Sequence, residues 1–452
     1  MAADGAALDR IREEVGRRGI EFFFAQFVDL YARPSAKLIP AAHLDDLVVD
    51  GAGFAGFAAG EIGQVPSDPD IAAMPDLDSF TPVPWQPNLA RFACDVTVEG
   101  EPWPYCPRTI LKGVLAKARE RGFEFKIGIE LEYFLVQQGE DGSIEIADRY
   151  DTLDKPCYDM AGLTRRYDFL TTVSRYCNEL GWDNYANDHE DANGQFEQNF
   201  EYADALTTCD RAIFFRYMVH ALAEQHGMIA TFMPKPFTHL TGNGAHLHMS
   251  LWRDGENLFL DESDPRGLGL SSVAYSFIGG LRAHARASSA LTAPTVNSYK
   301  RLKPGSTSSG ATWSPVWISY GYNNRTQMLR VNPGRVEDRT IDGSCNPYLA
   351  AATVLAAGLD GIENGMEAGE PNSENLYTSS YDELTARGFR SLPANLLDAV
   401  GELERDDVLR AALGRGRDED YVDYYVRVKR DEWFRYHEQV TPWEIREYLT
   451  RF

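Results

Sequence analysis

The stretch FEFKIGIELEYFL, residues 123–135, decides the fold of this chain. Its odd-numbered residues are all apolar, and this strict alternation predicts a β-strand with one buried face. The opposite face carries Lys126, Glu130 and Glu132. Along such a strand the two carboxylates lie roughly 7 Å apart. That spacing suits one ligand to each of two neighbouring metal ions better than two ligands to a single ion.

Three further segments repeat this period-two pattern of polar side chains. In the first, Glu190 and Glu197 flank a Gly-containing turn, and Glu197 alternates with its neighbours over 195–200. The polar positions of the other two carry His246 with His248 and Ser250, and Arg335 with Glu337 and Arg339. Four such strands together predict one sheet whose polar face is a site and not a solvent-exposed surface. Ligation by several oxygens and one imidazole is typical of Mg²⁺ or Mn²⁺ and not of structural zinc.

Composition narrows the class of protein. The 452 residues include 44 Lys and Arg against 68 Asp and Glu, a formal charge of −24, and 44% are hydrophobic. This balance is typical of a globular protein with two or three domains, and its acidity argues against nucleic acid or an anionic membrane as the main partner. Without a signal-peptide core in residues 1–18 or an apolar run of about 18 residues, we expect a cytoplasmic protein. The six cysteines are scattered and form no disulfide framework.

The order of predicted elements indicates an α+β chain. A helix is expected over 7–19, strands over 22–30, 36–39 and 91–98, and loop over the Gly-, Pro- and Asp-rich residues 51–88. Prolines near position 103 indicate a domain boundary there. The helices expected after this boundary cover 108–121, 160–180, 203–226, 272–290 and 346–364. The prediction is a small N-terminal domain over 1–103 and a large sheet-and-helix domain over 104–452.

Two other patterns concern phosphates and carboxylates. Residues 51–56 match G-x-G-x-x-G, but we reject a dinucleotide site because no helix is expected after them, and the chain has no P-loop motif. From Arg266 to Arg335 the sequence contains no acid and nine Lys or Arg residues. Such segregation of charge in an acidic protein predicts a pocket for anions.

The motifs together resemble the glutamine synthetase superfamily over nearly the whole chain. The resemblance is carried by GIELEYF (128–134), GQFE (194–197), ATFMPKPF (230–237), GNGAHLHMS (242–250), NSYKR (297–301), NRT (324–326), NPYL (346–349) and AGLDGI (357–362). It implies a β-grasp-like N-terminal domain and a catalytic domain with a curved antiparallel sheet flanked by helices. It also implies a homododecamer of two stacked hexameric rings with active sites between subunits.

The resemblance further implies a role for each site residue. Two or three Mg²⁺ or Mn²⁺ ions would be bound, the first by Glu132, Glu190 and Glu197, the second by Glu130, His246 and Glu337. ATP would contact His248, Ser250, Arg325 and Arg335, while Gly242, Arg301 and Arg339 would bind glutamate. Arg325 and Arg339 would also stabilise phosphoryl transfer. Asp29 from the neighbouring subunit, with Tyr158 and Glu190, would line an amine pocket.

The implied reaction joins ammonia or a small alkylamine to the γ-carboxylate of L-glutamate through γ-glutamyl phosphate, with ATP as the second substrate. Ordinary members carry a flap glutamate six residues after the arginine that matches Arg301. Here that position is Thr307, and the surrounding loop 303–313 contains no acid. The loss of charge and volume predicts a roomier pocket that is less selective for ammonium.

The loop also bears on the choice of amine. Residues 309–315 resemble the type III-like branch that includes γ-glutamylmethylamide synthetases, so methylamine is the expected acceptor. Glutamine synthesis from ammonia is the close alternative. A ligase for polyamines or ethanolamine is less favoured because a dicationic amine calls for extra acids near the flap. A non-catalytic ring-forming sensor is disfavoured because all six matched metal ligands are present.

Overall fold

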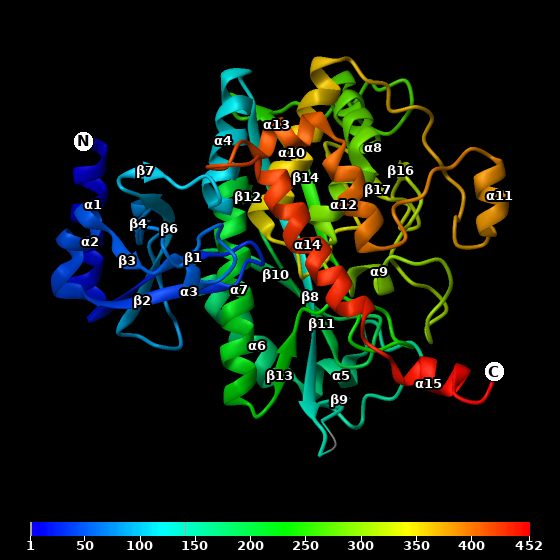
Figure 1. Cartoon of the computed structure of the whole chain (residues 1–452), viewed down its shortest axis with the longest axis horizontal. Helices are drawn as coiled ribbons and strands as arrows, with labels where there is room; N and C mark the ends of the chain where they lie inside the picture. Colours follow the sequence, from blue (N-terminus) through cyan, green and yellow to red (C-terminus); the bar gives the residue numbers. More distant parts are fainter. Residues whose placement is uncertain (1, 141) are drawn as a thin grey trace.

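The structure is a computed structural model that describes residues 2–140 and 142–452 (Figure 1). Over these residues the strands form one sheet of seven strands and one of eleven. Most helices belong to the part that holds the larger sheet (Figure 1). The expected α+β class is confirmed. Among the described residues, no helix is both long and apolar enough to cross a bilayer.

The smaller sheet is formed by the N-terminal part, in the order β2-β1-β6-β4-β3, with β5 and β7 paired to β6. Phe23, Ala25 and Phe27 of β1 alternate into the core, where Phe23 packs on Phe92 of β6 with ring centroids 5.3 Å apart. The elements of this part are β1 (Phe22–Val28), β2 (Pro34–Pro40), β3 (Ala52–Phe54), β4 (Ile71–Pro75), β5 (Thr81–Pro82), β6 (Leu89–Val98), β7 (Glu101–Pro102), α1 (Ala2–Arg18), α2 (Leu44–Asp50), α3 (Gly56–Ala59) and the short 3₁₀ turns η1 (Ala41–His43) and η2 (Leu77–Ser79).

The interpretation of residues 51–88 as loop is wrong in part. This segment contains β3, β4 and β5, and Ile71 and Ala73 of β4 are fully buried where β4 pairs with β6. The strands have two to five residues and lie in a segment rich in Gly, Pro and Asp, which masked the strand pattern. A helix, α3, does follow the glycine motif, but its four residues make a single turn and not the crossover helix of a dinucleotide fold.

The larger sheet has the order β10-β11-β8-β14-β18-β17-β16, and β8 is its central strand. Among the pairs that the structure describes in this sheet, β16 and β17 are parallel and the others antiparallel, so the expected antiparallel sheet carries one parallel edge. Its strands are β8 (Glu124–Gln138), β9 (Ile144–Ile146), β10 (Asn184–His189), β11 (Gln195–Phe200), β12 (Ala203–Asp204), β13 (Ile229–Thr231), β14 (Ala245–Arg253), β15 (Glu256–Asn257), β16 (Tyr320–Tyr322), β17 (Leu329–Asn332) and β18 (Arg335–Asp338).

The helices close the core around this sheet. The helix expected over 160–180 is two helices, because the backbone leaves helical geometry at Arg166 (φ −111°, ψ 14°). The helices are α4 (Pro107–Glu120), α5 (Met160–Arg165), α6 (Tyr167–Glu179), α7 (Ala205–Gln225), α8 (Ser272–Thr292), α9 (Ser298–Arg301), α10 (Pro347–Glu363), α11 (Tyr381–Ala386), α12 (Leu396–Glu404), α13 (Asp407–Leu413), α14 (Tyr421–His437) and α15 (Pro442–Tyr448).

Helices α8 and α10 lie in close contact at two glycines. A Cβ on Gly280 would lie 2.0 Å from the carbonyl oxygen of Ala357, and one on Gly361 would lie 2.2 Å from that of Ser276. No larger residue fits without moving a helix, so the pair of glycines sets how near the two helices approach.

A buried arginine, Arg108, links β6 of the smaller sheet to a helix next to the larger sheet. Arg108 at the start of α4 donates two hydrogen bonds to Asp210 of α7, at 3.0 and 2.9 Å. It also donates to Asp95 of β6 at 2.8 Å and to Asp76 at 2.9 Å. Because its side chain is 3% exposed, these carboxylates balance a charge that has lost its water.

Candidate active site

Strand register places five of the six predicted metal ligands, together with His248, on adjacent positions of the larger sheet. In the pairing of β8 with its neighbours, Glu130 lies opposite His246 and Glu132 lies opposite Glu197. On the other side of β14, His248 lies opposite Glu337. Residues directly opposite on antiparallel strands have their side chains on the same face, so the register alone brings these groups together.

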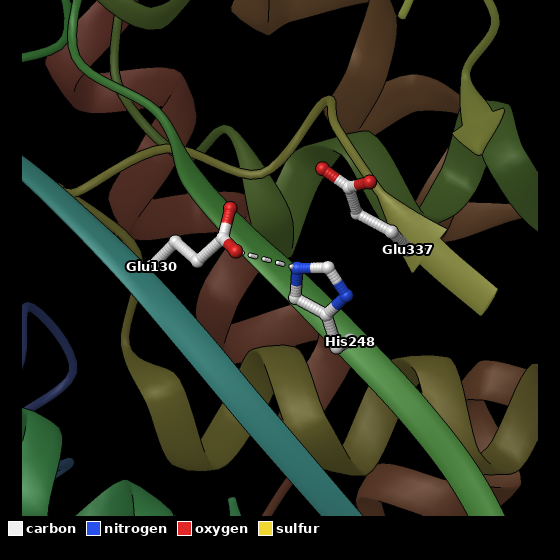
Figure 2. A group of neighbouring side chains, drawn as sticks. All are labelled: Glu130, His248 and Glu337. Carbon is white, nitrogen blue, oxygen red and sulfur yellow. Dashed lines mark ion pairs between the residues drawn. The ribbon is translucent and has the colours of Figure 1, made fainter. Parts of the chain in front are cut away.

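The side chains converge in space. Two groups are close enough to hold a cation, Glu130 with His248 and Glu337, and Glu130 with Glu197 and His246, each with its ligand atoms within 4.8 Å of one another. Figure 2 shows the first group, with His248 on its strand between the two glutamates. His248 Nε2 lies 3.0 Å from Glu130 Oε1. The period-two pattern placed His248 on the same face as His246, and the family resemblance assigns its imidazole to the phosphates of ATP.

His246 is the hub of the cluster. Its Nδ1 lies 3.3 Å from Glu130 Oε2 and 3.9 Å from Glu337 Oε1, and its Nε2 lies 3.7 Å from Glu132 Oε1. Burial, together with the charge of Arg339, lowers the pKa of His246 below its usual value. The imidazole is therefore neutral near pH 7, which is the form that binds a metal ion.

Burial and crowding disfavour the anionic form of two of the carboxylates, Glu190 and Glu197. Burial and then repulsion from Glu132 raise the pKa of Glu190 well above its usual value. Burial and repulsion from Glu130 and two further glutamates do the same for the pKa of Glu197. A divalent cation would relieve both effects, so these residues fit a site for such a cation.

Two of the glutamates are held as anions. Burial opposes this for Glu337, but Arg339 and the two imidazoles lower its pKa to about 2. Arg339 and Arg330 each donate to it, at 2.5 and 2.9 Å. Burial also opposes ionisation of Glu130, but His246 and His248 hold its pKa well below its usual value.

Several further residues hold the predicted metal ligands in place. The sequence analysis did not single them out as site residues. Gln195 is fully buried and donates to Glu132 Oε2 at 3.1 Å, where the Gly244 N–H also donates at 2.6 Å. His189 contacts two acceptors, the Glu190 carbonyl at 2.8 Å and Asp151 at 2.8 Å, so both ring nitrogens are protonated. Gln195 shares the period-two face of Glu197, which is the one sequence signal that could have identified it.

A second region is basic and fits a small anion. Arg301 is buried and donates to the carbonyl oxygens of Thr340 and Arg339, both at 3.0 Å. Gly242 lies against it, because a Cβ there would meet the Arg301 side chain at 3.2 Å. Among the described residues, Arg339 Nε is buried without a hydrogen-bond partner. Burial and the charges of Lys303 and Arg301 lower the pKa of Lys235, a residue the sequence analysis did not assign, to about 8.

A cavity opens beside the cluster between β8, β14 and β18. Its lining includes Glu130 and His248 of the cluster as well as Tyr202, Trp252 and Arg335. The rings of Tyr202 and Trp252 are stacked, with centroids 6.3 Å apart, and Lys126 Nζ lies 4.0 Å from the Trp252 centroid. The predicted Ser250 also lines this cavity and accepts the indole N–H of Trp252 at 2.8 Å.

The predicted amine-pocket residues are not all brought together. Asp29 lies in a separate cavity of the N-terminal part, with Tyr31, Arg33 and Glu61, and shares no lining residue with the cavity beside β8. Burial raises the pKa of Asp29, and the backbone N–H groups of Tyr31 and Arg33 donate to it at 2.9 Å. Within one chain, Asp29 is therefore not part of the carboxylate cluster.

Tyr158 and Arg325 lie at the exposed rim. Tyr158 has a left-handed backbone (φ 64°), and burial, then the nearby Cys157 and Glu190, raise its pKa to about 12, with Arg325 acting in the opposite direction. Arg325 is exposed. Thr307 donates to the Ala311 carbonyl within its own loop.

The segment from Arg266 to Arg335, which contains no acid, forms the predicted anion pocket only in part. Arg266 donates to the Gly369 carbonyl and Arg286 to Glu402, while Arg282 donates to the Ala368 carbonyl. These three arginines stabilise the packing around α8. The charge of Arg286 is neutralised by Glu402, and the N–H groups of the other two donate to backbone carbonyls distant in sequence. Arg301 and Arg335 of the same segment do lie at the two candidate binding regions.

Known proteins of similar sequence and fold show which family this chain belongs to. The family model described as glutamine synthetase, catalytic domain, matches residues 104–448. A glutamate–methylamine ligase of Methyloversatilis universalis is 46% identical over 434 residues, which cover 96% of this chain and 97% of that protein. A glutamine synthetase of Rhizobium leguminosarum bv. phaseoli is 44% identical over 430 residues, with 94% of this chain and 96% of that protein covered.

Solved structures agree. A GmaS–ADP complex matches with a TM-score of 0.90 at 49% identity, covering 97% of this chain and 98% of its own. Apo GmaS matches with a TM-score of 0.88 at 48% identity, covering 96% and 98%. With a matching family model over most of its length and relatives above 40% identity, this chain belongs to the glutamine synthetase family and is an ATP-dependent glutamate–amine or glutamate–ammonia ligase.

Proposed function

We propose that this chain joins a small alkylamine, methylamine before others, to the γ-carboxylate of L-glutamate, with ATP converted to ADP and phosphate. The observation that carries the choice of amine is Thr307, a neutral residue where ordinary family members carry a flap glutamate. The relative from Methyloversatilis universalis and the GmaS structures support it. A flap without its own carboxylate provides less attraction for ammonium and more room for a methyl group.

The residues divide into three binding regions in this proposal. Arg301, Gly242 and Arg339 would bind the carboxylates of glutamate. The two arginines provide buried positive charge, and Gly242 has no side chain that would fill the space beside Arg301. The cavity with Trp252 and Tyr202 would bind the purine on a flat aromatic face. Ser250 and Arg335 line the same cavity, and His248 lies where the phosphates would reach the carboxylates.

The carboxylate cluster would hold two or three divalent cations, Mg²⁺ or Mn²⁺. The proposed ligands are Glu132, Glu190 and Glu197 for one ion and Glu130, His246 and Glu337 for another. When bound, the cations offset the negative charge of the transferring phosphoryl group.

The reaction follows in two steps. The γ-carboxylate of glutamate attacks the γ-phosphorus of ATP, the bond to ADP breaks, and γ-glutamyl phosphate forms. Arg339, and Arg325 from the rim, would stabilise the negative charge on the transferred group. The neutral amine then attacks the acyl carbon, and the bond to phosphate breaks. Glu190, with its raised pKa, and Asp29 of a neighbouring subunit would accept the proton of the incoming ammonium ion.

The position of Asp29 supports an assembly with shared active sites. It lies in a cavity apart from the carboxylates of its own chain, so it can meet such a cluster only across a subunit interface. We propose the ring-shaped homododecamer that the family resemblance implies, with Tyr158 at the exposed rim facing the neighbour.

Glutamine synthesis from ammonia is the second candidate. Its support is specific, because glutamine synthetases of two Rhizobium species are 44% identical to this chain, nearly as similar as the methylamine ligase. The difference of two percentage points does not separate the acceptors.

The test is ATP-dependent phosphate release with L-glutamate and Mg²⁺, comparing ammonium, methylamine and ethylamine at equal concentration. A kcat/KM at least tenfold higher for methylamine, about 1.4 kcal/mol of discrimination, is the expected result. Thr307→Glu should lower the ratio of methylamine to ammonium activity, whereas Thr307→Gln, of similar volume but uncharged, should change it less. Higher kcat/KM for ammonium in the unmodified enzyme would make it a glutamine synthetase.

A further inference from the structure

Asp191 lies at the point where three segments of the site meet. It follows Glu190 in the turn between β10 and β11, and its own N–H donates to Glu190 Oε2 at 3.2 Å. Its carboxylate atom Oδ2 accepts a hydrogen bond from Ser309 Oγ at 2.5 Å and another from Thr241 Oγ1. Ser309 belongs to the flap, here defined as residues 303–313, and Thr241 directly precedes Gly242.

Thr307 completes this group of hydroxyls. Its Oγ1 lies 3.3 Å from Thr241 Oγ1 and 3.1 Å from Ser309 Oγ. The position that carries a glutamate in ordinary family members therefore carries a neutral hydroxyl beside a carboxylate from another segment. The expectation that no acid is near the flap is correct for the sequence of the loop but wrong in three dimensions.

Ser308 makes another attachment of the flap. The backbone N–H and the hydroxyl of Ser308 both donate to the His239 carbonyl at 3.0 Å. Those bonds join neutral groups, whereas the flap's bond to Asp191, donated by Ser309, ends on a carboxylate, and such charge-assisted bonds are about twice as strong as neutral ones. Asp191 is thus the strongest attachment of the flap to the turn that carries Glu190.

We propose that Asp191 is a positioning residue that fastens the flap through Ser309 and so keeps water from the acyl phosphate. This inference rests on the proposed function, because only an acyl-phosphate intermediate needs such protection. With the flap released, water attacks the acyl carbon of γ-glutamyl phosphate, the bond to phosphate breaks, and glutamate re-forms. ATP is then consumed without an amide being made, since closed lids are what prevents hydrolysis of reactive intermediates.

The test uses the full-length enzyme and two readouts. The first is hydrogen exchange of the flap without substrates, at the amides of Ser308 and Gly310, which are hydrogen-bonded to the His239 and Thr307 carbonyls. The second is the ratio of phosphate released to amide formed with ATP, Mg²⁺, L-glutamate and methylamine. Ser309→Ala and Asp191→Ala should each raise flap exchange about tenfold and raise the ratio above one.

A double variant distinguishes a shared role from two separate ones. Since Ser309 acts through Asp191, the Ser309→Ala/Asp191→Ala double variant should be no worse than Asp191→Ala alone. Ser306→Ala is the matched control, an exposed serine of the same flap, and it should leave the ratio at one.

The outcomes separate this inference from the proposed function. Unchanged flap exchange and a ratio of one in Ser309→Ala, which removes a single hydroxyl and is the mildest change, would overturn the role of Asp191. Additive effects in the double variant would also overturn it. Failure of the unmodified enzyme to form an amide from methylamine or ammonium would instead reject the proposed function, and flap exchange would still report whether Asp191 fastens the flap.

Discussion

Replacing Glu197 by glutamine is expected to stabilise the metal-free protein. The ligand atoms of Glu197 and Glu130 lie within 4.8 Å of each other, and at that separation two unit charges repel by about 3.5 kcal/mol at an effective dielectric constant of 20. The raised pKa of Glu197 means that proton uptake already relieves part of this repulsion. We therefore expect the free energy of unfolding of Glu197→Gln to be about 1–3 kcal/mol higher near pH 8.

The geometry of the site allows this change. Glutamine keeps the length of the side chain and an oxygen that accepts the Asn199 amide N–H, which donates to Glu197 at 3.0 Å. The variant removes a charge without opening a cavity, so packing contributes little to the difference. What the variant loses is a proposed anionic ligand for a cation.

Thermal unfolding with EDTA and with MgCl₂ measures both effects. In the unmodified protein, Mg²⁺ at 100 times its Kd should add about 2.7 kcal/mol of stability, and Glu197→Gln should lose most of this gain. Glu145→Gln, an exposed residue of β9 outside the site, serves as the matched control. A Glu197→Gln protein that is less stable without metal, or that gains as much from Mg²⁺ as the unmodified protein, would refute the reasoning.

Two further predictions concern the scaffold. Arg108→Met leaves three carboxylates without their buried partner and should cost about 3–5 kcal/mol in urea denaturation, whereas Lys112→Met, a more exposed neighbour that contacts two of the same acids, should cost less than half as much. Burial opposes protonation of His284, but hydrogen bonds to Asp406 and Asp360 raise its pKa above 6.5, so its stabilisation is complete below the unfolded pKa and is lost as pH rises through the folded one. His284→Gln should accordingly lower Tm most at pH 5.5–6 and least at pH 9, and a deficit that is constant with pH would count against a charged imidazole.

The sequence was most informative where a strand has one apolar and one functional face. In β8 the alternation of residues 123–135 predicts the strand, its buried side and the side that bears Glu130 and Glu132. The same period-two pattern located His246 and Glu337. The burial of the apolar face is the physical reason, because it forces every second residue to the opposite side.

The sequence was least informative where long-range contacts decide. The short strands of residues 51–88 form because β4 and β5 pair with β6, and β3 pairs with β4, although their own residues favour turns. The sequence suggested that Arg282 and Arg286 were available for anions, but α8 places them next to a carbonyl and an acid that lie 86 and 116 positions further along the chain. Asp191 contacts a serine 118 positions away, and no local pattern indicates such a pair.

Crowded buried carboxylates are an electrostatic cost that the fold must carry before any ligand arrives. The apolar face of β8 is what offsets it, because Ile127, Leu131 and Tyr133 are each at most 2% exposed and each contributes roughly 1.5–3 kcal/mol on burial. A slip of β8 by one residue would expose that whole face and bury the glutamates in the core. The packing of one strand therefore sets both the stability of the sheet and the register of the site, and this explains why a group of mutually repelling acids can persist at the centre of a folded protein.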